Sequence, residues 1–121
     1  MSVTESKENY LEIIHILKEK QKEVHAVDIA KYLGFARASV SIALKTLKDE
    51  KYISVDENSH ITLTPKGKTV AAKVYDKHKT LSAWFISMGV DEKTALNDAC
   101  KIEHIISEKS FKAIKSYLKN K

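Results

Sequence analysis

The sequence lacks the features that mark secreted and membrane proteins. Its 121 residues include one cysteine, Cys100, so an internal disulfide is excluded and a reducing compartment is expected. No apolar run approaches the roughly 20 residues that a membrane-spanning helix needs. Polar and charged residues follow the first methionine, so we expect no signal peptide. Internal repeats and low-complexity linkers are also missing. These absences predict a cytoplasmic protein of one compact unit or two small lobes, without a membrane partner.

Positive charge is in excess, and it is unevenly placed along the chain. The net charge is +5. Residues 1–64 carry nine basic and ten acidic side chains, whereas residues 65–121 carry twelve basic and six acidic ones. Within the first part, the basic side chains of Lys31, Arg37, Lys45 and Lys48 have no acidic neighbour before Asp49. That local cluster can meet the phosphates of a nucleic acid.

The stretch from Ala26 to Ile53 predicts two helices joined by a tight turn. In the first helix, Val27–Leu33, apolar residues recur at helical spacing. Gly34 follows, where a helix ends in a residue able to adopt a left-handed conformation. The second helix, from about Arg37 to Glu50, combines one apolar face with polar side chains elsewhere. This pattern indicates a helix-turn-helix whose second helix can enter the DNA major groove, and an ordinary helical hairpin is the alternative.

The flanking residues extend this motif to a winged helix-turn-helix domain over residues 1–64. A helix is predicted over residues 5–21, with Ser6 as its N-cap. Apolar and polar residues alternate in Tyr52–Thr64 on both sides of a turn at residues 57–59, which predicts a two-stranded β-hairpin. A hairpin placed directly after a recognition helix is a wing.

Residues 65–121 predict a second, helical domain. Pro65 suits the first position of a long helix that Gly89 ends. Further helices are expected over Asp91–Ser107 and from Glu108 to about Leu118. These helices look too few to close a core alone, so we expect a dimerisation domain. The predicted fold class is mainly α: a winged helix-turn-helix DNA-binding domain followed by an α-helical dimerisation domain.

Six polar side chains are candidates for contact with double-stranded DNA. Those near the start of the recognition helix are expected to contact base edges, and one further along to lie nearer the backbone. Lysines at the start of the next helix are expected to contact phosphates. The candidates are Arg37, Ser39 and Ser41 for bases, and Lys45, Lys66 and Lys68 for the backbone.

Cys100, Glu103 and His104 lie close together in the predicted helix over Asp91–Ser107. Because successive helical residues turn by about 100°, Glu103 and His104 should fall on either side of Cys100, one turn along. Thiolate, carboxylate and imidazole together suit a borderline divalent transition metal. The alternative is a small buried cysteine beside a surface Glu–His pair. The two-histidine zinc protease motif is absent and nothing indicates an oxyanion hole, so we do not expect an enzyme.

The order of these motifs resembles the metal-dependent repressors of the diphtheria toxin repressor and manganese transport regulator family. The motifs are a first helix with Glu12, the winged helix-turn-helix, TPKGK, a long helix with His78, then GVDE and ACKIEH. The resemblance implies a homodimeric, metal-activated repressor of metal-ion homeostasis genes, bound to a palindromic operator. In such proteins a divalent ion joins the first helix of the DNA-binding domain to the dimerisation lobe. Because the sequence ends at Lys121, we expect the short form, without the SH3-like domain of longer members.

The resemblance also implies a set of metal ligands. One ligand position departs from the family pattern, because it holds Asn where the manganese branch has Asp and the iron branch Met. A neutral amide oxygen is a weaker ligand than a carboxylate for a hard cation. Two positions of the ancillary site of the iron branch hold Ser82 and Leu96, so we expect that site to be lost. The implied ligands are Glu12, His78, Cys100, Glu103 and His104, with Asn9 at the departing position.

The chemistry of Cys100 guides the choice of metal. A soft thiolate favours iron or zinc over manganese, and raw affinity alone would favour Zn²⁺. We predict Fe²⁺ as the physiological activator, ahead of Mn²⁺, with one tightly held ion per subunit. Two other functions stay open: a winged-helix regulator without metal control, and a non-regulatory metal-binding protein or hydrolase that uses Cys100.

Overall fold

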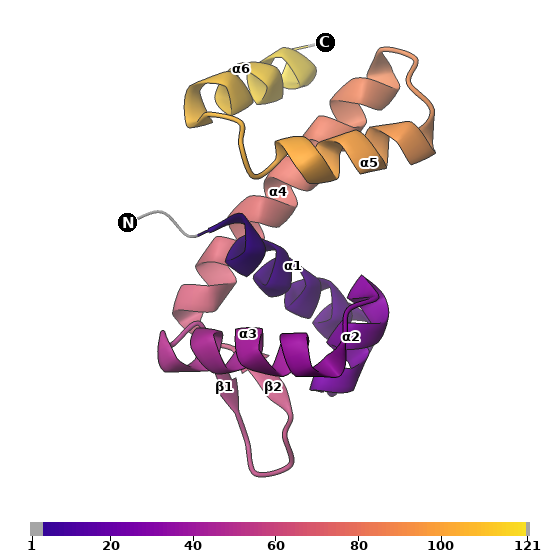
Figure 1. The fold of residues 1–121 in the computed structure, drawn as a ribbon. Coiled ribbons are helices and arrows are strands. Elements are labelled where there is room, and N and C mark those ends of the chain that lie inside the picture. Colours follow the sequence, from indigo (N-terminus) through magenta and orange to yellow (C-terminus); the bar gives the residue numbers. More distant parts are fainter. Residues whose placement is uncertain (1–3, 121) are drawn as a thin grey trace. The chain divides into compact units, whose positions relative to one another are not determined.

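The computed structural model describes residues 4–120, and the chain divides into two compact units. Unit 1 ends at Ala72 and unit 2 begins at Lys73, within one continuous helix, α4 (Pro65–Ser87). Six helices and a two-stranded antiparallel sheet make up the described residues (Figure 1). The mainly α fold predicted from the sequence is therefore confirmed.

Unit 1 packs three helices and a hairpin around one apolar core. Side chains that recur at helical spacing on each helix meet the inward side chains of the hairpin, as expected from the periodicity. The fully buried members include Leu11, Ile14, Ile29, Val40, Leu47 and Ile61. The elements are α1 (Glu5–Lys20), α2 (Ala26–Leu33), α3 (Arg37–Asp49), β1 (Ile53–Val55) and β2 (Ile61–Leu63).

The predicted N-cap of α1 is wrong by two residues. Thr4 is the cap: its backbone is extended, and its Oγ1 accepts a hydrogen bond from the backbone N–H of Lys7 at 3.3 Å. Ser6 lies inside the first helical turn instead. A cap residue must have non-helical backbone angles, and the sequence alone did not decide which hydroxyl would adopt them.

Gly34 makes the turn between α2 and α3, as predicted. Its φ of 71° and ψ of 28° place it in the left-handed region, and its N–H donates to the Ala30 carbonyl at 2.9 Å. Few residues other than glycine adopt this conformation without strain. At the other end of α2, Asp28 Oδ2 accepts from the backbone N–H of His25 at 2.8 Å. These local bonds fix both ends of the short helix.

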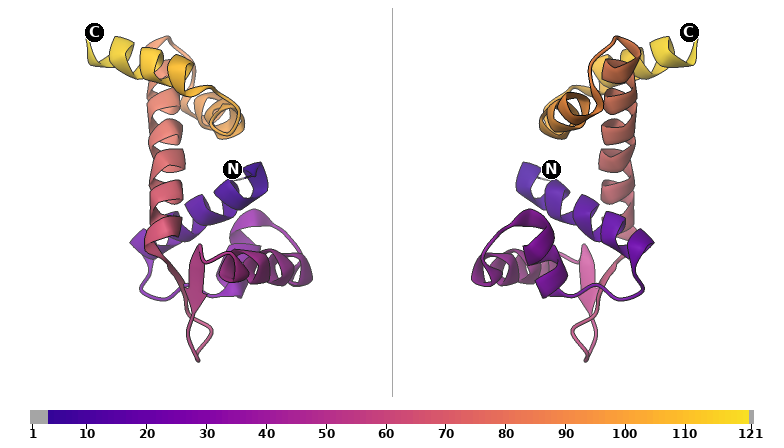
Figure 2. Two further views of the ribbon diagram at one scale, coloured as in Figure 1. Left: turned by 90° about the vertical axis from the view of Figure 1, so that its left-hand side faces the viewer. Right: turned by 90° about the vertical axis from the view of Figure 1, so that its right-hand side faces the viewer.

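The hairpin forms the predicted wing. Its strands pair in the register Ile53↔Leu63, Ser54↔Thr62 and Val55↔Ile61, and both views of Figure 2 show it projecting beyond α3. Asp56 Oδ1 closes the turn by accepting from the backbone N–H groups of His60 and Asn58, each at 2.9 Å. These hydrogen bonds hold the pKa of the Asp56 carboxyl below its usual value.

Hydrogen bonds of Thr64 connect the start of α4 to the residues that follow α3. Thr64 Oγ1 donates to the carbonyls of Lys51 and Tyr52, at 2.7 and 3.0 Å, and accepts from the N–H of Gly67 at 3.1 Å. A Cβ atom added to Gly67 would overlap the Tyr52 carbonyl oxygen. The glycine of the TPKGK motif therefore allows α4 to approach this backbone closely.

Unit 2 contains the rest of α4, with α5 (Glu92–Ile102) and α6 (Glu108–Lys119). Gly89, with a φ of 97°, follows the end of α4 as predicted. Asp91 caps α5 by accepting from the N–H of Thr94 at 3.0 Å, and this bond holds the pKa of Asp91 below its usual value. Among residues 4–120, no helix is both long and apolar enough to span a bilayer.

The predicted end of α5 at Ser107 is wrong, because the helix ends at Ile102. Residues 103–106 form a turn in which the N–H groups of Ile105 and Ile106 both donate to the Ile102 carbonyl, each at 2.9 Å. Ser107 has an extended backbone and caps α6, its Oγ accepting from Ser110 N–H at 3.1 Å. An N-cap cannot be helical, so the chain must leave α5 before it.

Apolar side chains remain exposed on unit 2. Val74, Leu81 and Phe111 are among its buried residues, but Met88 and Tyr117 are more than half exposed. A groove of 390 Å³ on its surface is lined by Trp84, Met88, Ala113, Ile114 and Tyr117. Exposed apolar surface that lies together favours contact with another chain.

Candidate DNA-binding surface and metal centre

The recognition helix α3 presents the predicted base-contact side chains to solvent. Its inner face is buried through Val40, Leu44 and Leu47. Ile42 is also 71% exposed, although the sequence did not single it out. Its helical position relative to the buried residues was the signal that could have identified it. The exposed polar candidates on α3 are Arg37, Ser39, Ser41 and Lys45.

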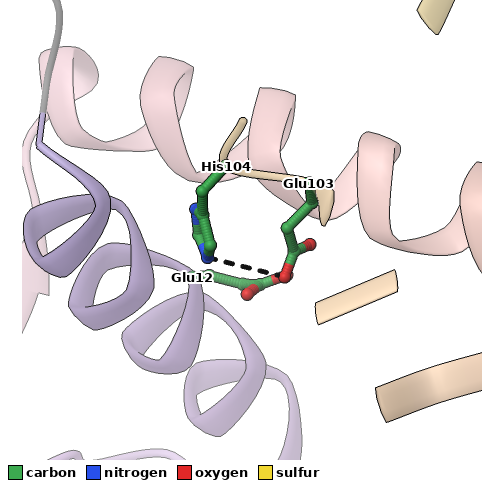
Figure 3. Close-up of side chains that lie close together, drawn as sticks. All are labelled: Glu12, Glu103 and His104. Atoms are coloured by element: carbon green, nitrogen blue, oxygen red, sulfur yellow. Dashed lines mark ion pairs between the residues drawn. The ribbon is translucent and has the colours of Figure 1, made fainter. Parts of the chain in front are cut away.

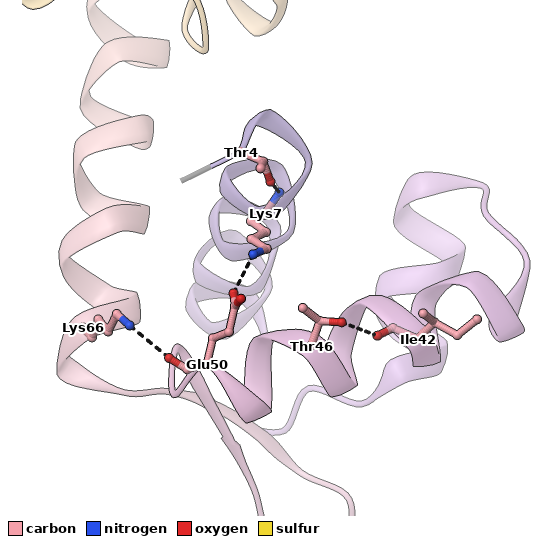
Figure 4. A network of polar contacts seen from close by, with 6 residues as sticks. All are labelled: Thr4, Lys7, Ile42, Thr46, Glu50 and Lys66. Carbon is pink, nitrogen blue, oxygen red and sulfur yellow. Dashed lines mark hydrogen bonds and ion pairs between the residues drawn. The ribbon is translucent and has the colours of Figure 1, made fainter. Parts of the chain in front are cut away.

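Lys66 has a structural contact that the sequence did not predict. Its Nζ donates to the Glu50 carbonyl at 3.0 Å and lies 4.2 Å from the centre of the Tyr52 ring. The Glu50 side chain pairs with Lys7, with 2.6 Å between Oε1 and Nζ (Figure 4). A cation beside the last carbonyls of a helix interacts favourably with the helix dipole. Lys66 therefore stabilises the end of α3, whereas Lys68 is exposed on the first turn of α4.

Glu103 is the centre of a buried polar cluster in unit 2. It is 1% exposed and caps the end of α5, its N–H donating to the Ala99 carbonyl at 2.9 Å. His78 Nδ1 lies 3.4 Å from Oε2, and His104 Nε2 lies 3.7 Å from Oε1. The close-up in Figure 3 marks the His104–Glu103 pair. Two imidazoles therefore approach one carboxylate from α4 and from the turn after α5.

The arrangement differs from the one predicted along the helix. Glu103 and His104 were expected within a helix, one turn beyond Cys100, but both lie past the end of α5. The turn required before α6 moves them off the helix, and the tertiary fold brings them to His78. Cys100 lies on α5 itself, with its side chain exposed.

The residues of this cluster fit a divalent metal ion. Within residues 4–120, neither Glu103 carboxylate oxygen accepts a hydrogen bond, although both are buried. A buried carboxylate without donors is costly unless a cation neutralises its charge. Carboxylate and imidazole are ligands for Mn²⁺, Fe²⁺ and Zn²⁺. The Glu103 carboxylate and the two imidazoles therefore suit a bound transition metal better than they suit an ion pair with a purely structural role.

Two further predicted ligands lie on α1, and the two positions of the ancillary site lie on α4 and α5. Glu12 is buried on α1, at 4% exposure, and Asn9 is half-buried one turn earlier. Ser82 Oγ donates to the His78 carbonyl at 2.7 Å, and Leu96 offers no donor atom for a metal.

Unit 1 is a winged helix-turn-helix, and unit 2 is helical with a buried carboxylate–imidazole cluster. This combination is typical of metal-responsive DNA-binding regulators. Sequence comparisons identify the family. The profile described as "Iron dependent repressor, N-terminal DNA binding domain" matches residues 2–61. The profile described as "Iron dependent repressor, metal binding and dimerisation domain" matches residues 64–121. The chain belongs to this family of metal-dependent transcriptional regulators, as the motifs implied.

Individual relatives cover most of the chain. It is 35% identical over 118 residues to the HTH-type transcriptional regulator MJ0568 of Methanocaldococcus jannaschii, covering 96% of this chain and 94% of that protein. It is 32% identical over 111 residues to the transcriptional regulator MntR of Bacillus subtilis, covering 92% and 78%. The crystal structure of T. acidophilum IdeR matches 98% of this chain with a TM-score of 0.83 and 27% identity. The chain spans 55% of that structure's length.

Proposed function

We propose that this protein is a cytoplasmic, homodimeric, metal-activated repressor that binds a palindromic operator of metal-ion homeostasis genes. The observation that carries the proposal is the buried Glu103 carboxylate, approached by two imidazoles and given no hydrogen bond by the described residues. The exposed recognition helix in unit 1 supplies the DNA-binding surface. The family membership supports the combination of the two activities in one chain.

The proposed ligand set draws on both units. Unit 2 would supply His78, Glu103 and His104, together with Cys100, and unit 1 would supply Glu12. Asn9 is a further candidate through its amide oxygen. A bound divalent ion would supply the positive charge that offsets the buried carboxylates. Support for Glu12 comes from its burial and from its place in the family motif.

This division of ligands explains how metal occupancy could control DNA binding. Ligands from two units contribute their full binding free energy only in arrangements where they converge. The population of such arrangements therefore rises with metal concentration, and operator affinity rises with it if they suit the two half-sites. The recognition helix keeps its place within unit 1 with or without metal, because unit 1 has its own apolar core.

The first test is operator binding under anaerobic conditions. Binding-site selection on random duplex DNA would give the consensus, and affinity for it would then be titrated with Fe²⁺, Mn²⁺ and Zn²⁺. We expect a metal-dependent rise in affinity. Equal affinity with and without metal would indicate a winged-helix regulator without metal control. A metal-binding protein that selects no sequence would indicate a non-regulatory function.

Arg37→Ala should relax specificity at one base position in each half-site. A bidentate arginine–guanine pair is worth about 1–3 kcal/mol of discrimination, and Arg37 begins α3, where recognition helices contact bases. Binding-site selection with the mutant would measure the change. If mutant and wild type give the same consensus, Arg37 does not contact a base.

Lys68→Ala should weaken binding to all sequences by a similar factor. Removing one lysine–phosphate pair should reduce the slope of log affinity against log salt by about 1. Lys93→Ala, an exposed lysine at the start of α5, is the matched control and should leave the slope unchanged. Equal slopes for all three proteins would show that Lys68 does not contact the DNA backbone.

Lys66→Ala should weaken DNA binding in the same way and should in addition lower the stability of the protein, because it removes the hydrogen bond to the Glu50 carbonyl.

Cys100→Asp should move the metal response toward Mn²⁺. Replacing a soft thiolate by a hard carboxylate removes the preference for iron that we propose for wild type. The measurement is the free Fe²⁺ and Mn²⁺ concentration at half-maximal operator binding. Cys100→Ser separates loss of the thiolate from gain of a carboxylate. If wild type already responds better to Mn²⁺ and neither substitution changes the ratio, Cys100 does not select the metal.

A further inference from the structure

Ile42 occupies the centre of the exposed face of the recognition helix. Single exposed apolar residues are common on protein surfaces, so exposure of 71% is not sufficient evidence of a role. The helical position is more informative. At about 100° per residue, Ile42 lies roughly 200° from both Val40 and Leu44 and 140° from Leu47, which are all buried. Ile42 is therefore directed almost opposite to the core of unit 1.

The residues one turn on either side of Ile42 have small side chains. Ala38 lies one turn before it and Thr46 one turn after it, and both are exposed. Thr46 Oγ1 donates to the Ile42 carbonyl at 3.3 Å, so this hydroxyl is used within α3 (Figure 4). The polar candidates Arg37, Ser41 and Lys45 lie to one side of the line through these residues, and Ser39 lies to the other. Ile42 is thus the large apolar side chain in the middle of this exposed face, with the polar candidates Ser39 and Lys45 three residues away on either side.

We propose that Ile42 reads thymine through contact with its C5-methyl group. Among the four bases of unmodified DNA, the thymine methyl is the apolar group presented in the major groove. Bringing an aliphatic side chain against it removes apolar surface from water on both sides. Cytosine lacks the methyl group there, and a purine would place a hydrogen-bonding edge against Ile42 and leave it without a partner. The inference rests on the proposed DNA-binding function and adds the identity of one recognised base.

The test uses duplexes in which single thymines of the selected consensus are replaced by deoxyuridine. Uracil keeps every hydrogen-bonding group of thymine and lacks only the methyl group. For wild type with metal, we expect about a fourfold loss of affinity at one thymine position in each half-site, from the burial of one methyl. Ile42→Ala should bind the thymine duplex more weakly and lose the difference between thymine and uracil at that position.

Two controls make the comparison specific. Arg37→Ala should keep the uracil penalty, because it removes a different contact. Thermal unfolding of Ile42→Ala should match wild type, because the side chain is exposed. A wild-type protein insensitive to every uracil, or an Ile42→Ala protein with the wild-type pattern of penalties, would overturn the inference while the proposed function stands. A wild-type protein that selects no sequence would overturn both.

Discussion

Glu103→Gln should abolish the stimulation of operator binding by metal while the protein stays folded without metal. Glutamine keeps the shape of the side chain but removes the negative charge between His78 and His104. We expect metal affinity to fall by more than about 100-fold, beyond the 10–100-fold cost of losing a group that only orients a ligand. Operator binding titrated with Fe²⁺ and Mn²⁺ would measure the loss.

The stability of the metal-free protein distinguishes an ion that regulates an already folded protein from an ion that the protein needs in order to fold. Because Glu103→Gln removes a buried charge without hydrogen-bond donors, its unfolding midpoint without metal should equal or exceed that of wild type. Glu92→Gln, an exposed change in the first turn of α5, is the charge-matched control. A Glu103→Gln protein still activated by metal would exclude Glu103 as a ligand. Wild type that is largely unfolded without metal, by circular dichroism, would make the ion a folding cofactor instead.

Gly67→Ala should destabilise unit 1 by about 3 kcal/mol, at the upper end of overpacking substitutions. The added Cβ would overlap the Tyr52 carbonyl oxygen, and a backbone atom cannot move aside as a flexible side chain can. The Leu63 side chain, 3.3 Å from the same position, leaves little room for α4 to shift. A change of this size should lower the melting temperature by about 15 °C in a domain of this length.

Gly34 provides the matched comparison, because its substitution costs free energy for a different reason. A Cβ there would meet no atom within 4 Å, and only the left-handed backbone opposes alanine. We expect Gly34→Ala to cost about 1 kcal/mol and Gly34→Asn less, since asparagine tolerates this conformation. Gly67→Asn should be no better than Gly67→Ala. Urea unfolding of the four variants would test this order, and a smaller loss for Gly67→Ala than for Gly34→Ala would contradict it.

The sequence by itself determined the elements whose signals are local. Helical spacing of apolar residues located α1 to α3, and Gly34, Pro65 and Gly89 marked a turn, a helix start and a helix end. Alternation located the hairpin. Each signal depends on backbone preferences or burial periodicity within a few residues, so no distant contact was needed. The family resemblance followed from the order of these elements and from short motifs within them.

Only the tertiary structure decided which distant residues meet. His78 lies 25 positions before Glu103, and the packing of α4 and of the turn after α5 brings the two side chains together. The structure also places Cys100 on α5 with its side chain exposed. Lys66 is held by the Glu50 carbonyl, and Gly67 passes close to Tyr52, through contacts that no local pattern encodes. Helix positions depend on short-range preferences, whereas these contacts depend on how whole elements pack, and packing is set by side chains far apart in the chain.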